Sequence, residues 1–289
     1  INLSYDRLFG EKHRVGALFF FYAQSKSDAF NSENSTENVF KAVPYRNAAF
    51  SGRATYAYDE RYFAEFNFGY TGSENFEKNK RFGFFPAVAF GWMVSNEKFV
   101  KDHVGWLNQL KLRSSYGVVG SDAGIPNNIQ TAYVNRVNGV FGRDPASVTT
   151  SEVLDMVIDY GLHWEEARQF DLGLDFRALN NRLTLEFDYY IKTTANILTN
   201  ITLPGISGST YSPLSNIAKA RNTGIEFNIG WRENRGDFSY DLSLIGTTLK
   251  NKVVSVNQNL PPLENGANVT KVGYPIGGFW GYEVLGIYQ

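Results

Sequence analysis

The side chains of this sequence that could perform acid–base or metal chemistry are few and widely spaced. Glu165 and Glu166 are adjacent, so on a strand their carboxylates would point to opposite faces and could not share a proton. Asp155 and Asp159 lie outside any calcium-loop pattern. None of the three histidines has a second ligand at metal-site spacing. These histidines are His13, His103 and His163.

Several other classes of chemistry have no matching motif. The chain has 289 residues and no cysteine, which excludes a disulfide scaffold and the usual cysteine-containing zinc sites. Residues 127–128 and 205–208 are typical of turns, and neither a phosphate-binding glycine loop nor a nucleophile elbow occurs. A formal net charge of -1 offers no basic surface for nucleic acid. We therefore expect no enzymatic activity, no cofactor, no metal and no nucleic-acid partner.

The composition favours strands connected by many turns. Aromatic residues make up 16% of the chain, with 27 glycines, 9 prolines and only 2 methionines. No run approaches the roughly 18 apolar residues of a membrane-spanning helix, whereas a membrane strand needs only about 9 to 11 residues. Residues 1–6 lack the basic and apolar regions of a signal peptide and look like the middle of a strand.

The clearest structural pattern lies in residues 162–192. In its first arm one face is apolar, with Phe170, Leu172, Leu174 and Phe176. The intervening residues are Asp171, Gly173, Asp175 and Arg177. Residues 183–192 repeat this alternation after a turn at 178–182, and side chains two apart share one face of a strand. The segment predicts a two-faced β-hairpin, which suits a soluble antiparallel sheet or a membrane barrel.

Similar alternating segments recur along the chain and predict about ten antiparallel strands with alternately short and long connections. In outer-membrane barrels the short turns face the periplasm and the long loops face outside. This rule places on the periplasmic side the turns near Gly10, Glu60, Asn181 and Arg235. It places outside the loops near Asn34, Asn75, Gly139 and Gly208.

The distribution of aromatic and charged residues favours an all-β transmembrane barrel. Some aromatic residues fall near predicted strand ends, as in interfacial girdles. These are Tyr62, Tyr70, Trp92, Trp164 and Trp231. Acidic and basic residues nearly balance on the polar face, which favours a neutral polar solute or an internal plug over an ion-selective pore. A soluble propeller or β-sandwich with these aromatics over its core is the alternative.

The longest segment without a sustained strand pattern is residues 120–162. A loop of this length in a compact domain usually carries function. Its candidate substrate-binding residues are Tyr133, Arg136 and Phe141, which combine aromatic surface with a cation. The alternative is that these aromatic residues only pack within the loop.

Two motifs follow one another in the chain, RFGFFP at 81–86 with GW at 91–92 and then LKLRSSYG at 110–117. They resemble successive strands of the SusC/RagA class of TonB-linked outer-membrane transporters of Bacteroidetes-type bacteria, and further motifs match that family in the same order. The hairpin carries WE at 164–165, GLD at 173–175, NRL at 181–183 and DYY at 188–190. Further matches are NTGIE at 222–226, GYP at 273–275, GY at 281–282 and GIYQ at 286–289.

The resemblance implies that residues 1–289 are part of one barrel domain of about 22 strands, with the plug, signal peptide and terminal strands outside this chain. It implies active import of an oligosaccharide or peptide across the bacterial outer membrane. The implied partners are TonB, contacted through segments outside this chain, a SusD-like surface lipoprotein and the outer-membrane lipid. Two alternatives are a passive porin or structural outer-membrane barrel, and a soluble carbohydrate-binding β protein.

Overall fold

The computed structural model describes residues 1–26, 45–125, 132–140, 148–156, 161–201, 213–256, 263–281 and 286. For residues 132–140, 148–156 and 263–265 the description covers the backbone.

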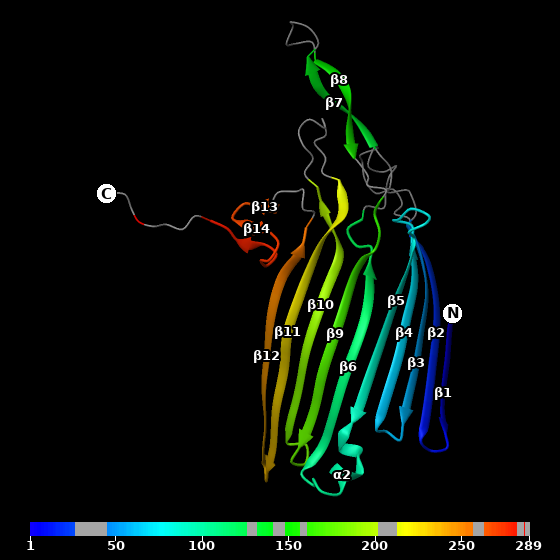
Figure 1. The fold of residues 1–289 in the computed structure, drawn as a ribbon, viewed down its shortest axis with the longest axis vertical. Coiled ribbons are helices and arrows are strands. Elements are labelled where there is room, and N and C mark those ends of the chain that lie inside the picture. Colours follow the sequence, from blue (N-terminus) through cyan, green and yellow to red (C-terminus); the bar gives the residue numbers. More distant parts are fainter. Residues whose placement is uncertain are drawn as a thin grey trace.

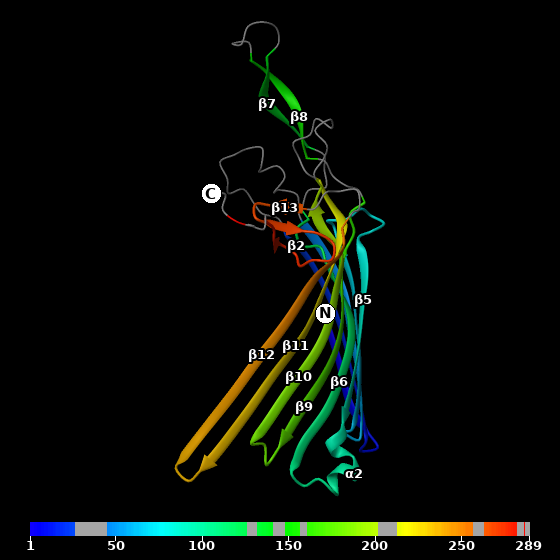
Figure 2. The same ribbon diagram turned by 60° about the vertical axis from the view of Figure 1, so that its left-hand side comes forward.

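Ten antiparallel strands form one twisted, curved sheet, in which they lie side by side in the order β1-β2-β3-β4-β5-β6-β9-β10-β11-β12 (Figures 1 and 2). Their bounds are β1 Asn2–Phe9, β2 His13–Lys26, β3 Tyr45–Tyr58, β4 Tyr62–Ser73, β5 Phe82–Met93, β6 Leu107–Ser121, β9 Glu165–Ala178, β10 Leu183–Asn200, β11 Leu214–Arg235 and β12 Phe238–Ser255. The prediction of about ten antiparallel strands is confirmed. Each strand pairs with its neighbour in the chain, except that β6 pairs with β9.

The connections differ between the two ends of the sheet. Tight turns join β1 to β2, β3 to β4, β9 to β10 and β11 to β12, and all four lie at the lower end in Figure 1. Residues with positive φ close them, including Gly10, Asn181 and Gly236. We call this the short-turn end. The loop around Asn75 lies at the opposite, long-loop end, as predicted, whereas Asn34 and Gly208 lie outside the described residues.

The predicted loop at residues 120–162 is wrong in part. Residues 120–162 contain a hairpin of β7 (Ala132–Val140) and β8 (Val148–Met156), which stands beyond the long-loop end in Figure 1. The sequence of this hairpin lacks the sustained period-two pattern by which a half-buried strand is predicted. On either side of the loop predicted near Gly208, β10 extends to Asn200 and β11 begins at Leu214.

Three smaller features complete the described chain. Two short helical segments, η1 (Val94–Asn96) and α2 (Lys98–Lys101), lie between β5 and β6 at the short-turn end. After β12 a small sheet contains β13 (Leu263–Asn265), β14 (Asn268–Thr270) and β15 (Gly278–Phe279). Among the described residues, no helix is both long enough and apolar enough to cross a membrane.

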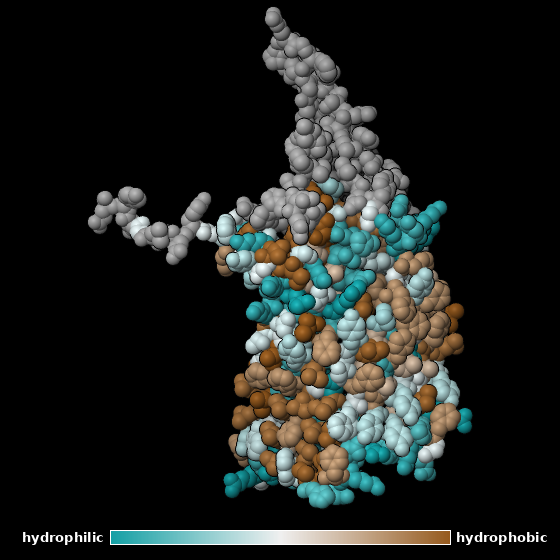
Figure 3. Space-filling view, viewed as in Figure 1, coloured by the Kyte–Doolittle hydropathy of each residue, from teal (hydrophilic) through white to brown (hydrophobic). Residues whose placement is uncertain are grey.

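The main sheet has one apolar face. Cross-strand partners share a face, and the pairing places large apolar side chains together on the side that we call the outer face. Among them Phe66 is 43% exposed, Leu172 49% and Ile229 38%. Figure 3 shows apolar and aromatic side chains over the middle and lower part of the visible surface, with hydrophilic ones above them and along the lower rim. An apolar surface of this extent marks contact with lipid or protein.

Candidate functional site: the inner wall of the sheet

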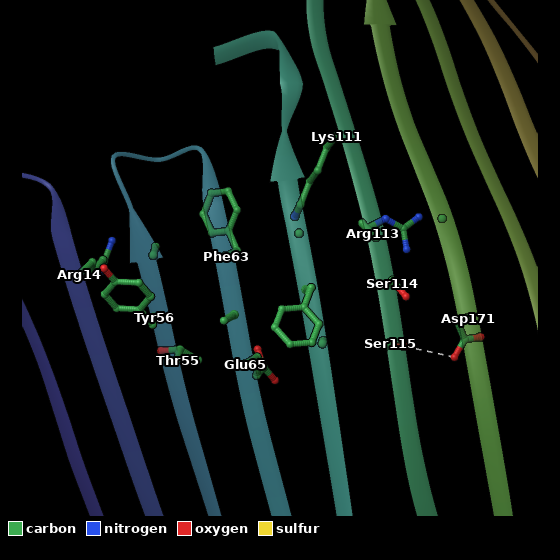
Figure 4. Close-up of a pocket in the computed structure, with 16 residues that line it drawn as sticks. Arg14, Thr55, Tyr56, Phe63, Glu65, Lys111, Arg113, Ser114, Ser115 and Asp171 are labelled. Carbon is green, nitrogen blue, oxygen red and sulfur yellow. Dashed lines mark hydrogen bonds between the residues drawn. The ribbon is translucent and has the colours of Figure 1, made fainter. Parts of the chain in front are cut away.

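The other side of the sheet, which we call the inner face, carries charged and hydroxyl side chains. On β6, β9 and β10 alternate residues supply it, so Ser115 and Asp171 are cross-strand partners there, as are Lys111 and Asp175. A depression opens along this wall, and Figure 4 shows residues of β2, β3, β4, β6 and β9 around it. The inner face is therefore the candidate functional surface.

An arginine bridges three strands at the centre of the inner wall. Arg113 of β6 donates from Nε to Asp175 of β9 at 2.9 Å, and from Nη2 to Asp188 of β10 at 3.1 Å. Gly173 lies between these groups, since it pairs with Arg113 on one side and with Asp188 on the other. A Cβ at Gly173 would lie 2.7 Å from Arg113 Cζ and 2.5 Å from Asp188 Oδ1. The bridge can form because glycine has no Cβ at this position.

We predict that Gly173→Val displaces the Arg113 guanidinium and separates it from Asp188. The free energy of unfolding of the intact protein in detergent should fall by roughly 1–2 kcal/mol, because Asp188 loses its cationic partner. Gly69→Val is the matched control, since a Cβ there would meet only Thr71 Oγ1, at 3.9 Å. Equal stability of the two variants would show that the bridge contributes nothing.

Some of the other inner-face charges also have partners. Arg53 lies 2.6 Å from Glu65, whose second oxygen accepts from Asn67 at 2.7 Å. Asp171 accepts from Ser115 at 3.2 Å, which Figure 4 marks, and from Gln169 at 2.8 Å. Opposite charges that lie side by side partly cancel each other's field, so around these pairs the wall presents hydrogen-bonding groups without a strong preference for one sign of charge.

The residues considered for catalysis do not come together. The ring nitrogens Nδ1 of His13, His103 and His163 contact Tyr56 Oη, the Phe99 carbonyl and the Gly161 carbonyl, respectively. Glu165 accepts from the Leu198 N–H, whereas Glu166 pairs with Arg168 at 2.9 Å. Within the described ranges, no three histidine, aspartate or glutamate side chains form a metal site. Asp155 lies in β8, and Asp159 lies outside the described residues.

The girdle prediction is wrong for Trp164. Its side chain is only 8% exposed and contacts Phe76 and Phe85, with ring centroids 4.9 and 5.3 Å away. Its indole N–H donates to the Arg81 carbonyl at 3.2 Å. Trp164 therefore belongs to a small core at the long-loop end and not to the lipid boundary. This core also includes Ile125 and Leu162, with Leu198 and Leu214 against it.

The other four aromatic residues lie on the outer face by register. Tyr62 and Trp92 are cross-strand partners near the short-turn end, and Trp231 pairs with Leu183 at the same end. Tyr70 lies further along β4, toward the long-loop end. Their position is the one that a girdle requires, and the girdle assignment stays a prediction.

Polar side chains hold the long-loop end together. Asp122 Oδ2 accepts from Tyr45 Oη at 2.8 Å, Ser73 Oγ at 2.6 Å and Asn75 Nδ2 at 3.2 Å. The Asn216 side chain accepts from the His163 N–H at 2.9 Å and donates to the His163 and Asn196 carbonyls at 2.9 and 2.7 Å. The Asn216 bonds satisfy backbone groups, and Asp122 joins β3 and β4 to the end of β6, so both residues fix the bases of the long loops.

Sequence reasoning missed a carboxylate at the short-turn end. Glu97, between η1 and α2, is only 8% exposed. It accepts from Tyr62 Oη at 2.6 Å, Trp92 Nε1 at 3.1 Å and Arg61 Nη1 at 3.0 Å. Segment 93–100 contains both apolar and polar residues, so the local sequence gave no signal that this acid is buried. The carboxylate ties the β5–β6 connection to the outer face.

The hydrogen bonds from Tyr62 and Trp92, together with Arg61, lower the pKa of Glu97 below its ordinary value of about 4.3. A lowered folded-state pKa means that this carboxylate stabilises the fold at neutral pH, and that the effect is lost as the pH falls through that pKa. Glu97→Gln should therefore lower Tm at pH 7, and its Tm should approach that of the wild type as the pH falls below the ordinary carboxyl range. A Tm difference that is constant from pH 7 to pH 3 would contradict this assignment.

A curved antiparallel sheet with an apolar outer face, a polar inner face and short turns at one end defines the wall of an outer-membrane β-barrel. The chain belongs to the TonB dependent receptor-like, beta-barrel family, whose model matches residues 1–288. The predicted family, barrel fold and location in the bacterial outer membrane are confirmed.

Relatives and solved structures agree with this assignment. TonB-dependent receptor P3 of Formosa agariphila is 34% identical over 82% of this chain and 24% of its own length. TonB-dependent receptor SusC of Bacteroides thetaiotaomicron is 29% identical over 89% of this chain and 27% of its own length. The chain thus spans about a quarter of these relatives. The structure of the RagAB peptide importer in its closed-closed state matches with a TM-score of 0.75 and 23% identity, over 95% of this chain and 32% of that one, and shows the shared fold.

Proposed function

We propose that the protein containing this chain is an active importer of the outer membrane, energised through TonB and working with a SusD-like surface lipoprotein. The observation that carries this proposal is the family match. The inner face of the sheet agrees with it, because this face is polar and has ion pairs between neighbouring strands. Such a wall suits a lumen that holds a plug and admits a polar solute. The role is transport, and no enzymatic step is assigned to it.

The substrate class in this proposal is a peptide or an oligosaccharide. A structural relative is described as a peptide importer, and the relatives are called TonB-dependent receptors. In the same proposal, residues 1–289 are part of one barrel domain of about 22 strands. The proposal places the plug, the signal peptide and the segment that contacts TonB in other parts of the protein. This chain covers about a quarter of the length of its relatives.

The proposed substrate contacts are Tyr133 and Arg136, whose backbone lies in β7 on the hairpin beyond the long-loop end. Phe141, the third predicted contact, lies outside the described residues. The small core around Trp164 and the Asp122 hydrogen bonds support this proposal, because they fix the loop bases from which the hairpin extends.

Uptake in cells tests the proposal. A strain without the gene is complemented with wild-type protein, and uptake of labelled peptide and oligosaccharide pools is measured with and without a protonophore. An importer gives uptake of one pool that needs the protein and stops when the membrane is de-energised. Uptake that persists after de-energisation would identify a passive pore. Tyr133→Ala combined with Arg136→Ala should reduce uptake at unchanged protein level, whereas the control Lys101→Gln, at the opposite end, should not.

A further inference from the structure

Basic side chains form a row on the outer face of the sheet. The row crosses the four neighbouring strands β9 to β12, three of which carry its basic residues. Arg168 of β9 and Arg221 of β11 both pair with Thr193 of β10, and Arg221 pairs in turn with Lys252 of β12. Cross-strand partners share a face, and these four alternate with inner-face residues such as Gln169 and Lys192. Strands are about 4.8 Å apart, so the row extends over roughly 14 Å. Lys250 lies two residues along β12, on the same face.

The row lies at the upper boundary of the apolar band. Trp231 and Arg221 both lie on the outer face of β11, ten residues apart. Trp231 lies near the short-turn end, and Arg221 lies below the long loops. Ten residues of a strand rise about 33 Å, and a tilt of about 40° reduces this to about 25 Å along the membrane normal. The apolar band of an outer-membrane barrel is about 25 Å tall. The row therefore falls at the boundary with the extracellular leaflet.

The cations of the row are exposed and incompletely neutralised. Arg168 is 57% exposed and pairs with Glu166 at 2.9 Å, and Arg221 donates to Thr193 Oγ1 at 3.4 Å. Lys250 and Lys252 are exposed, and neither forms an ion pair with the part of the chain that the structure describes. Like charges on directly opposed residues, as at Arg221 and Lys252, destabilise a sheet. An anion bound between these side chains would remove that cost.

We propose that this row binds the phosphate of a phosphorylated lipid headgroup in the extracellular leaflet of the outer membrane. Guanidinium and ammonium groups bind phosphate oxygens through charge-assisted hydrogen bonds. The apolar residues immediately below the row, Phe170 and Ile191 among them, lie where the acyl chains of such a lipid begin. The charge of the row and its continuity with the lipid face both select a membrane lipid as the occupant.

Retention of lipid by the intact protein tests the proposal. The purified protein in detergent is titrated with lipid A carrying its phosphates or with the same lipid after removal of the phosphates, and bound lipid is counted by native mass spectrometry. The test variant is Arg221→Gln combined with Lys252→Gln. The matched control, Lys98→Gln combined with Lys101→Gln, removes the same charge from exposed residues at the short-turn end.

The proposal predicts that wild type and control retain the phosphorylated lipid, and that the test variant binds it roughly 10- to 30-fold more weakly. Removal of the phosphates should weaken binding to the wild type by a similar factor. Equal retention by wild type and test variant would overturn the proposal, as would an equal loss in the control. The unfolding temperature of each variant is measured beside the binding, and a further variant, Lys250→Gln with Lys252→Gln, replaces the first if that one fails to fold.

Discussion

Ser114→Arg is expected to prevent stable insertion of the barrel, whereas Ser115→Arg is expected to be tolerated. The two serines are neighbours on β6, but Ser114 pairs with Leu172 on the outer face and Ser115 pairs with Asp171 on the inner face. An arginine near the bilayer midplane on the lipid side costs about 2–4 kcal/mol. An arginine on the inner face instead gains a carboxylate partner in Asp171.

The measurement is the amount of folded protein in outer-membrane fractions, read from heat-modifiable migration on gels. Ser114→Arg should give little folded protein, and Ser115→Arg should give an amount close to the wild type. The two changes are identical in chemistry and adjacent in sequence, so only the face differs. Equal folding of both variants, or the reverse order, would show that the two faces are wrongly assigned.

Trp164→Ala should cause the largest loss of stability among the aromatic substitutions, about 3–5 kcal/mol. The residue is 8% exposed, and its removal leaves a cavity beside Phe76, which is 1% exposed, and takes away the hydrogen bond to the Arg81 carbonyl. The loss should also loosen the long-loop end, so hydrogen exchange in residues 74–81 should become faster. Because this end holds the β7–β8 hairpin, uptake should fall as well.

Trp280→Ala provides the matched comparison, because this tryptophan is 56% exposed. Its main structural bond, from its backbone N–H to the Ala267 carbonyl, survives the substitution. Urea unfolding of the two variants in the same detergent gives the comparison. A Trp164 variant no less stable than the Trp280 variant would contradict the assignment of Trp164 to a core.

The alternation of apolar and polar residues in the sequence predicted much of the main sheet. The pattern of Leu172 and Leu174 against Asp171 and Asp175 needs no long-range information, because a strand places successive side chains on opposite faces. Turn residues such as Asn181 have positive φ in the structure and mark their own position locally. The strands, their faces and the asymmetry of their connections were therefore accessible from local sequence.

Contacts between distant segments were not accessible in this way. Trp164 lies at a strand entrance, and nothing near it in sequence shows that Phe76 packs over its ring. The bridge of Arg113 across Gly173 depends on the register between β6 and β9. Residues 122–164 separate these two strands in the sequence, so a local pattern does not predict that register. Glu97 gains its partners Tyr62 and Trp92 only when the β5–β6 connection packs on the outer face.

Single-cysteine scanning of β9 tests most directly the claim that this sheet separates lipid from a polar lumen. The chain has no cysteine of its own, so residues 169–176 except Gly173 can each carry a nitroxide label in the intact protein in bilayers. Collision rates are measured with oxygen, which concentrates in lipid, and with a water-soluble nickel complex. We predict that labels at 170, 172, 174 and 176 collide mainly with oxygen, and those at 169, 171 and 175 mainly with nickel. Labels that all collide with nickel, without alternation, would contradict the account.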